Sequence, residues 1–211
     1  MSKVSAIQLN SGPNVKVNLY DVKTFIEQIA DLGSKMVVLP ENFALMPEND
    51  ADYIKHAEEL GDGQIQNYIS DLASSYKIWI VGGTIPIKSK DKNRVMASTI
   101  TYNEKGEQVS LYNKIHLFDV TLPKSQESYN ESKYFMPGDK IEVIDTPIGR
   151  AGIACCYDLR FPELFRLQQE QKVDVIILPA SFTEQTGKVH WETLIKARAI
   201  ENLSFVVSSC Q

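Results

Sequence analysis

The sequence is poor in cysteine and histidine, and this scarcity argues against several kinds of site. Its three cysteines, Cys155, Cys156 and Cys210, are an odd number, and their spacing suits neither a disulfide framework nor a zinc site. The three histidines also lack the spacing of metal ligands. We therefore expect a protein of a reducing compartment, the cytoplasm, with no bound metal.

Long apolar runs and an excess of positive charge are absent as well. No apolar run is long enough to span a bilayer, so no membrane partner is expected. Residues 1–4 pass directly into a short strand pattern, and we expect no signal peptide. The net charge is −5, and acidic and basic residues alternate along the chain without a basic stripe that would bind nucleic acid.

What the sequence does contain is an alternation of short apolar runs and amphipathic segments, which predicts an α/β layer fold. A length of 211 residues is enough for one sizeable domain, and no linker or internal repeat divides residues 1–211. Helices are expected over about 14–33, 65–76, from 161, and 189–202. Strands are expected over 4–9, 36–39, 78–81, 95–102, up to 113, 141–144, 150–155, 173–178 and 204–209.

Three of these apolar runs are each followed by one reactive side chain. Glu41 follows residues 36–40, Lys114 follows 109–113, and Cys156 follows 152–155. In α/β sheets, ligands bind beyond the carboxyl ends of the strands. A carboxylate, an ammonium and a thiol at such an edge could form an active site, because a nearby base activates a thiol. This pattern indicates a thiol-dependent amide hydrolase.

Three motifs around these residues resemble the nitrilase, or carbon–nitrogen hydrolase, superfamily. They are Leu39-Pro40-Glu41, Asn113-Lys114-Ile115-His116-Leu117 and Cys156-Tyr157-Asp158-Leu159-Arg160-Phe161-Pro162-Glu163-Leu164. The resemblance runs from the first strand to the last residue. It implies a four-layer αββα sandwich, an architecture that periodicity alone would not predict.

The resemblance also implies a Glu–Lys–Cys catalytic triad. Cys156 would be the nucleophile, Glu41 the general base, and Lys114 the group that stabilises the oxyanion together with the backbone N–H of Tyr157. Without the resemblance, a small buried core residue is the commoner fate of a free cysteine such as Cys156. Glu41 is then consistent with a helix-entry or surface carboxylate, and Lys114 with an ordinary surface lysine. Cys155 is expected on the other side of its strand, in the core.

A fourth residue, Glu131, matches a second glutamate of the family seven residues before a glycine, here Gly138. The resemblance implies that it positions Lys114 and the substrate. Glu127 is a competing candidate, and a solvated loop carboxylate is the alternative for both. Residues 121–140 are polar and are expected to form a long loop that acts as a lid over the site.

Substrate contacts are expected from three further residues. Arg160 lies where one branch of the family binds the substrate carboxylate, since a guanidinium pairs well with a carboxylate. The alternative is a structural ion pair with Asp158 or Glu163. Phe182 and Thr186 match a segment that lines the pocket in that branch, and a plain loop is their alternative.

Residues 186–192 and 196–202 resemble the Nit subgroup, which contains ω-amidases acting on α-keto acid amides and amidases acting on deaminated glutathione. The expected activity is hydrolysis of the terminal amide of a small carboxylate-bearing compound through a Cys156 thioester, with release of ammonia. The reaction needs no metal or organic cofactor. The family also suggests a homodimer.

The resemblance departs from the family at one point, because members continue well past Gln211. The sandwich is therefore expected to be C-terminally short and to lack its last strands, which leaves open a catalytically inactive protein with a binding or assembly role. An N-carbamoyl amino acid amidohydrolase is a further alternative. So is a Cys–His hydrolase using His116 or His190.

Overall fold

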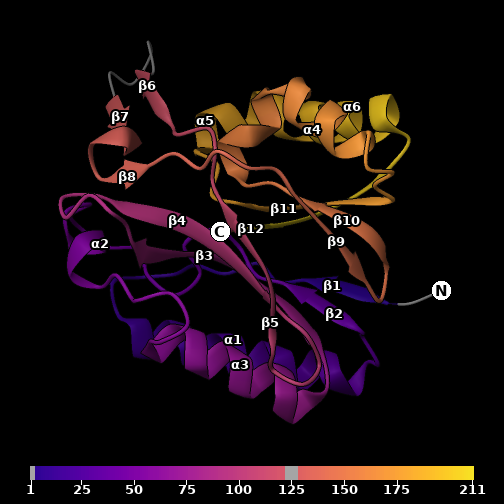
Figure 1. Ribbon diagram of the computed structural model, residues 1–211, viewed down its shortest axis with the longest axis horizontal. Coiled ribbons are helices and arrows are strands. Elements are labelled where there is room, and N and C mark those ends of the chain that lie inside the picture. Colours follow the sequence, from indigo (N-terminus) through magenta and orange to yellow (C-terminus); the bar gives the residue numbers. More distant parts are fainter. Residues whose placement is uncertain (1–2, 122–127) are drawn as a thin grey trace.

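Two β-sheets face each other in the computed structural model, and helices cover both outer faces (Figure 1). The structure describes residues 3–121 and 128–211. The first sheet has the order β1-β2-β3-β4-β5, with β8 added beside β4, and the second has the order β12-β11-β10-β9. This arrangement confirms the predicted four-layer αββα sandwich.

The first sheet consists of β1 (Val4–Ala6), β2 (Met36–Val38), β3 (Trp79–Lys88), β4 (Val95–Tyr102), β5 (Gln108–Asn113) and β8 (Phe135–Met136). The second consists of β9 (Glu142–Thr146), β10 (Gly149–Ile153), β11 (Val175–Ala180) and β12 (Phe205–Cys210). Strands β1 to β3 are parallel, and so are β10 to β12. In α/β sheets, ligands bind beyond the carboxyl ends of parallel strands. The segments after β2 in the first sheet and after β10 in the second are therefore each available to build a site.

Helices α1 (Val15–Asp31) and α3 (Gln64–Tyr76) pack on the first sheet, and α4 (Pro162–Gln169) and α6 (Glu192–Asn202) on the second (Figure 1). The predicted cap of the first helix is confirmed, since the Asn14 side chain accepts hydrogen bonds from the backbone N–H groups of Lys16 and Val17. Val22 and Ile26 of its apolar stripe are fully buried.

The core between the two sheets is apolar and carries the site at one end. Side chains of Val38 and Tyr112 from the first sheet meet those of Ile153 and Ile177 from the second. A fully buried aliphatic side chain of this kind stabilises the fold by about 1.5–3 kcal/mol. The segments that follow these strands are therefore held on a rigid base.

The prediction of an irregular loop over residues 121–140 was wrong for the part that the structure describes. Strand β6 (Asp119–Thr121) pairs with β7 (Ser128–Asn130), and the short 3-10 helix η1 (Glu131–Lys133) leads into β8. The segment is joined to the first sheet because β8 pairs with β4 and the backbone N–H of Val95 donates to the carbonyl oxygen of Tyr134. Glu127 lies outside the described residues.

Sequence patterns also missed two features. The helix α2 (Asp52–Lys55) has a single turn, which is too short for a helical repeat of apolar residues to show in the sequence. Strand β3 runs to Lys88, beyond the predicted end at 81, because a bulge between Gly82 and Ile85 interrupts the pattern without ending the strand. No helix among the described residues combines the length and the apolar character needed to cross a membrane.

Candidate active site

The three reactive residues reach one place from both sheets. Glu41 lies three residues after the end of β2, and Lys114 directly follows β5. Cys156 begins the short 3-10 helix η2 (Cys156–Arg160), which follows β10 in the second sheet. The site therefore lies where the edges of two facing sheets meet, and not at the edge of one sheet.

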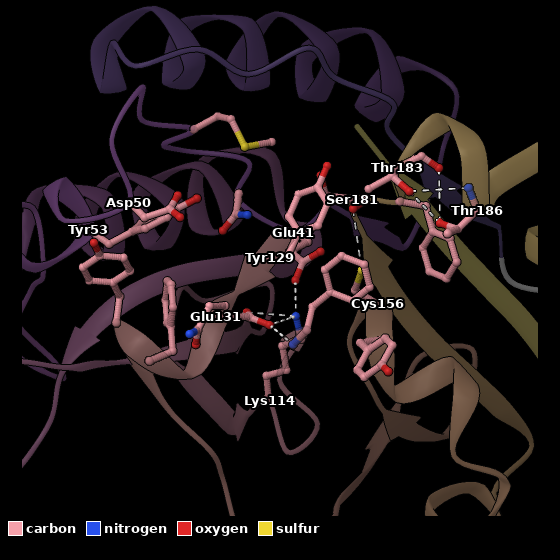
Figure 2. A pocket seen from close by; sticks show the side chains of 18 of the residues that line it. Glu41, Asp50, Tyr53, Lys114, Tyr129, Glu131, Cys156, Ser181, Thr183 and Thr186 are labelled. Carbon is pink, nitrogen blue, oxygen red and sulfur yellow. Dashed lines mark hydrogen bonds and ion pairs between the residues drawn. The ribbon is translucent and has the colours of Figure 1, made fainter. Parts of the chain in front are cut away.

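Lys114 is the centre of a buried ion cluster (Figure 2). Its Nζ lies 2.8 Å from Oε1 of Glu41, and 2.9 and 2.8 Å from Oε1 and Oε2 of Glu131. The side chains of Lys114 and Glu41 are 2% and 6% exposed. The alternative of surface charges therefore does not hold for either residue. Two carboxylates around one ammonium leave the cluster with a net negative charge.

The charges in this cluster shift the pKa values of Lys114 and Glu131. Burial alone lowers the pKa of Lys114, but the carboxylates of Glu131 and Glu41 outweigh it and hold that pKa well above its usual value. Burial raises the pKa of Glu131, and Lys114 opposes this effect. Lys114 is consequently a permanent cation at neutral pH.

Cys156 is held in a strained backbone conformation at the turn between β10 and η2. Its φ of 47° lies in the left-handed region, which costs a non-glycine residue on the order of 1 kcal/mol or more. Its Sγ lies 3.8 Å from the carbonyl oxygen of Ser181. Burial, followed by the charge of Glu41, raises the pKa of the Cys156 thiol well above its usual value, so the resting group is a neutral thiol.

A cavity of about 350 Å³ opens onto this cluster. Eight predicted site residues line it, namely Glu41, Lys114, Glu131, Cys156, Tyr157, Arg160, Phe182 and Thr186. The structure thus brings them together around one space, with Cys156 between the Lys114 cluster and Ser181 (Figure 2). Among the described residues, no group of three or more His, Cys, Asp or Glu side chains is arranged to hold a metal ion.

Arg160 reaches the cavity from η2 and lies among aromatic rings. Its guanidinium carbon is 5.9 Å from the ring centre of Tyr157 and 5.6 Å from that of Phe182, and its Nη1 is 3.3 Å from Nδ1 of His190. Among the described residues, Arg160 forms no ion pair with Asp158 or Glu163, so the alternative of a structural ion pair was wrong. Arg160 therefore presents a cation at the cavity wall.

Phe182 and Thr186 lie on the segment after β11. The Phe182 ring packs edge to face against Trp191, with ring centres 4.7 Å apart. Thr186 is held by Thr183, whose Oγ1 lies 2.7 Å from that of Thr186 (Figure 2). This wall of the cavity is thus apolar at Phe182 and hydroxyl-bearing at the two threonines.

Asp158 joins the nucleophile turn to the Lys114 segment. It is fully buried and accepts hydrogen bonds from the Tyr112 hydroxyl at 2.6 Å and the Cys155 N–H at 2.8 Å. It also accepts from the backbone N–H of His116 at 3.0 Å and lies 2.7 Å from His116 Nδ1. One carboxylate therefore ties the chain beside Cys156 to the chain on both sides of Lys114.

Sequence reasoning missed Asp158 as a functional candidate, although its place in the Cys156 motif was a usable signal. It also missed further residues that line the cavity, namely Asp50 before α2, Tyr53 on α2, Tyr129 on β7 and Tyr134 at the end of η1. Burial, followed by the charge of Glu41, raises the pKa of Tyr53, so its ring carries a neutral hydroxyl. No spacing in the sequence relates these residues to Cys156.

Comparisons with known proteins agree with this geometry. Residues 3–211 match the carbon–nitrogen hydrolase family. The chain is 39% identical over its whole length to a deaminated glutathione amidase of Yersinia enterocolitica, of which it covers 73%. It is 36% identical to the omega-amidase NIT3 of Saccharomyces cerevisiae, with 97% of this chain and 72% of that protein covered.

A solved structure, the C. elegans NitFhit protein, superposes on the whole chain with a TM-score of 0.90 at 32% identity. The chain spans about half of that protein, 52%. The family match over almost the full length, the relatives above 30% identity and the shared sandwich lead to one conclusion: the chain belongs to the carbon–nitrogen hydrolase family.

Proposed function

We propose that this protein is an amidase that hydrolyses a small carboxylate-bearing amide through a covalent thioester at Cys156. The observation that carries the proposal is the buried Glu41–Lys114–Glu131 cluster beside Cys156 in one cavity. This set supplies the base, the fixed cation and the nucleophile that acyl transfer needs.

In the first step, Glu41 takes the proton of the Cys156 thiol while sulfur attacks the amide carbon. A free thiolate would sit beside the net negative cluster, so the proton stays on sulfur until substrate arrives. Transfer of the proton as the C–S bond forms avoids that repulsion. A positioned general base of this kind contributes roughly 10²–10⁴-fold to a rate.

In the second step, the tetrahedral oxyanion is stabilised by the Lys114 ammonium and the backbone N–H of Tyr157. The C–N bond breaks, Glu41 returns the proton to the departing nitrogen, and the amine leaves, as ammonia when the amide is primary. A water molecule deprotonated by Glu41 then hydrolyses the thioester. The products are the free acid and the restored thiol, with no cofactor.

Glu131 is proposed to position Lys114, because its two oxygens both contact Nζ while its Oε2 accepts the backbone N–H of Phe118 at 2.6 Å. This second contact fixes the carboxylate to the start of the hairpin. Lys114 is thereby held from both sides, by Glu41 and Glu131. A fixed ammonium needs no reorganisation when the oxyanion forms.

Arg160 is proposed to bind the substrate carboxylate, and Phe182 and Thr186 to contact the chain between carboxylate and amide. The names of the relatives, deaminated glutathione amidase and omega-amidase, support an acyl group of this kind. We further propose a cytoplasmic homodimer. Light scattering on a sizing column would test the dimer, and a monomer at micromolar concentration would contradict it.

The test is hydrolysis by the purified chain of a panel comprising α-ketoglutaramate, α-ketosuccinamate, deaminated glutathione, an N-carbamoyl amino acid and a neutral aliphatic amide. Cys156→Ala is the blank. We expect turnover of one or more carboxylate-bearing amides that requires Cys156. Trapping of an acyl-enzyme on Cys156 by acid quench and mass spectrometry would support the thioester. No turnover by folded protein would contradict the proposed activity.

A further inference from the structure

Cys155, next to the proposed nucleophile, has a thiol that the reaction described above does not use. It is fully buried, and its Sγ lies 3.4 Å from Oε1 of Glu41. Cys156 lines the cavity, whereas Cys155 is not among the described residues that do. Its expected place in the core is confirmed, but the side chain also reaches the proposed base.

The direction of this side chain is set by the backbone. The Cys155 N–H donates to Oδ2 of Asp158 at 2.8 Å, and the Cys155 carbonyl accepts the Asp158 N–H at 3.0 Å. Apolar residues from both sheets, including Val38 and Ile153, surround the side chain. A buried thiol with both backbone groups bound has little freedom, so its contact with Glu41 is built into the fold.

Oε1 of Glu41 thus faces two donors, the Lys114 ammonium at 2.8 Å and the Cys155 thiol at 3.4 Å. We infer that Cys155 is a positioning residue whose S–H group donates to Glu41 and holds that carboxylate against the Cys156 thiol. The inference rests on the proposed function of Glu41 as the base. Both adjacent cysteines would then interact with the Glu41 carboxylate, Cys156 as the nucleophile and Cys155 as the donor that holds the carboxylate in place.

The Cys155 S–H donor also affects the negative charge on the Glu41 carboxylate. An S–H donor draws electron density from the carboxylate and stabilises its ionised form. Without this donor, the negative charge on Glu41 is less offset and repels a Cys156 thiolate more strongly. The ionisable groups that face Glu41 among the described residues are Tyr53, Lys114, Glu131, Cys155, Cys156 and Cys210.

The first experiment measures alkylation of Cys156 by iodoacetamide, which needs no substrate and no turnover. In Cys155→Ala we expect the alkylation rate at neutral pH to fall about threefold, the effect of one weak hydrogen bond to a charged group. Cys155→Ser keeps a donor and should restore most of the rate. Cys210→Ala is the matched control for the loss of a thiol, because the hydrogen bonds of that sulfur go to the backbone of Phe182 and Gln211, and Glu41 acts on it through its charge alone.

A double-variant cycle separates anchoring from packing. Once Glu41→Gln has removed the carboxylate, Cys155→Ala should no longer change alkylation of Cys156, because the two residues act through one contact. A purely structural role predicts the same fold-change in both backgrounds. That result would overturn the inference, as would an unchanged rate in Cys155→Ala when its thermal unfolding matches the parent.

Turnover supplies the second readout. In an active enzyme, Cys155→Ala should lower kcat about three- to tenfold with little change in KM, while Cys155→Ser retains most of the parent kcat. An equal loss in both variants would contradict a donor role. If the parent hydrolyses nothing, the proposed function fails, but the alkylation cycle still decides the role of Cys155.

Discussion

Replacing Glu41 by Gln should separate two properties that are usually lost together, namely the reactivity of Cys156 and its catalysis. The amide keeps the shape of the side chain and one oxygen for the Lys114 contact of 2.8 Å, but it removes the negative charge and the base. Amide hydrolysis should fall by roughly 10²–10⁴-fold, the usual contribution of a general base. Alkylation of the same thiol should become faster.

The size of the increase follows from the charges. At hydrogen-bond range, roughly 4 Å, two unit negative charges repel by about 4 kcal/mol at an effective dielectric of about 20. Suppose that solvent and the retained charge of Lys114 reduce this by two thirds. The remaining ~1.4 kcal/mol makes the thiolate about tenfold more abundant at neutral pH. Thiolate nucleophilicity falls along with its proton affinity, so the net gain in alkylation is at least about threefold.

The assay is the second-order rate of iodoacetamide labelling at several pH values, with the modified residue located by peptide mass spectrometry and Cys156→Ser as the blank. Glu142→Gln, in a half-buried carboxylate of β9, controls for the loss of a glutamate as such. Slower labelling of Glu41→Gln across the whole pH range would refute the electrostatic reasoning. Near-normal hydrolysis would refute the role of Glu41 as base.

Three further predictions concern the substrate, the fold and pH. Arg160→Ala should raise KM for carboxylate-bearing amides about tenfold or more and leave KM for a neutral amide unaffected, since one charge-assisted contact contributes about 1.5–3 kcal/mol. Equal effects on both amides in steady-state kinetics would count against carboxylate binding by Arg160. Asp158→Asn should lower the free energy of unfolding by about 2–4 kcal/mol in urea titrations, because the new NH₂ faces hydrogen-bond donors at a fully buried position. Burial raises the pKa of Cys155, Cys156 and Tyr112, so from about pH 9 upward the unfolded chain loses protons that the folded chain keeps. Stability should consequently fall as pH rises above that value, and a Tm that stays constant from pH 8 to 10.5 would contradict this.

Sequence predicts well those parts of the fold whose structure is determined by neighbouring residues alone. Asn14 caps α1 because its side chain can accept the first N–H groups of the helix, and this depends on no other segment. The apolar runs of β2 and β11 are buried on both faces and are visible as runs. The hairpin β6–β7 was missed because its strands are short, polar and exposed, so only their pairing defines them.

The candidate site was predictable for a different reason. Glu41, Lys114 and Cys156 lie 73 and 42 positions apart along the chain, and nothing local relates them. Family motifs supplied that relation, whereas Asp50 and Tyr53 belong to no motif, and only the folding of α2 and the segment before it brings them to the cavity. Cys155 shows most clearly what a local pattern does not predict. Alternation along a strand correctly places it in the core, but alternation cannot show that Glu41 from the facing sheet ends beside its sulfur.

The meeting of two sheets explains why so many charged groups can lie out of water at this site. Isolated burial of any one of them would cost several kcal/mol, and removing one partner from a buried pair costs about 3–5 kcal/mol. Lys114 offsets the two carboxylates, Asp158 receives four hydrogen-bonding contacts, and the Cys155 thiol completes the shell of Glu41. Within the Lys114 cluster, two carboxylates face one ammonium, and the excess negative charge lies next to Cys156. The arrangement keeps the resting thiol protonated, and it leaves a base in place to take that proton when an amide carbon arrives.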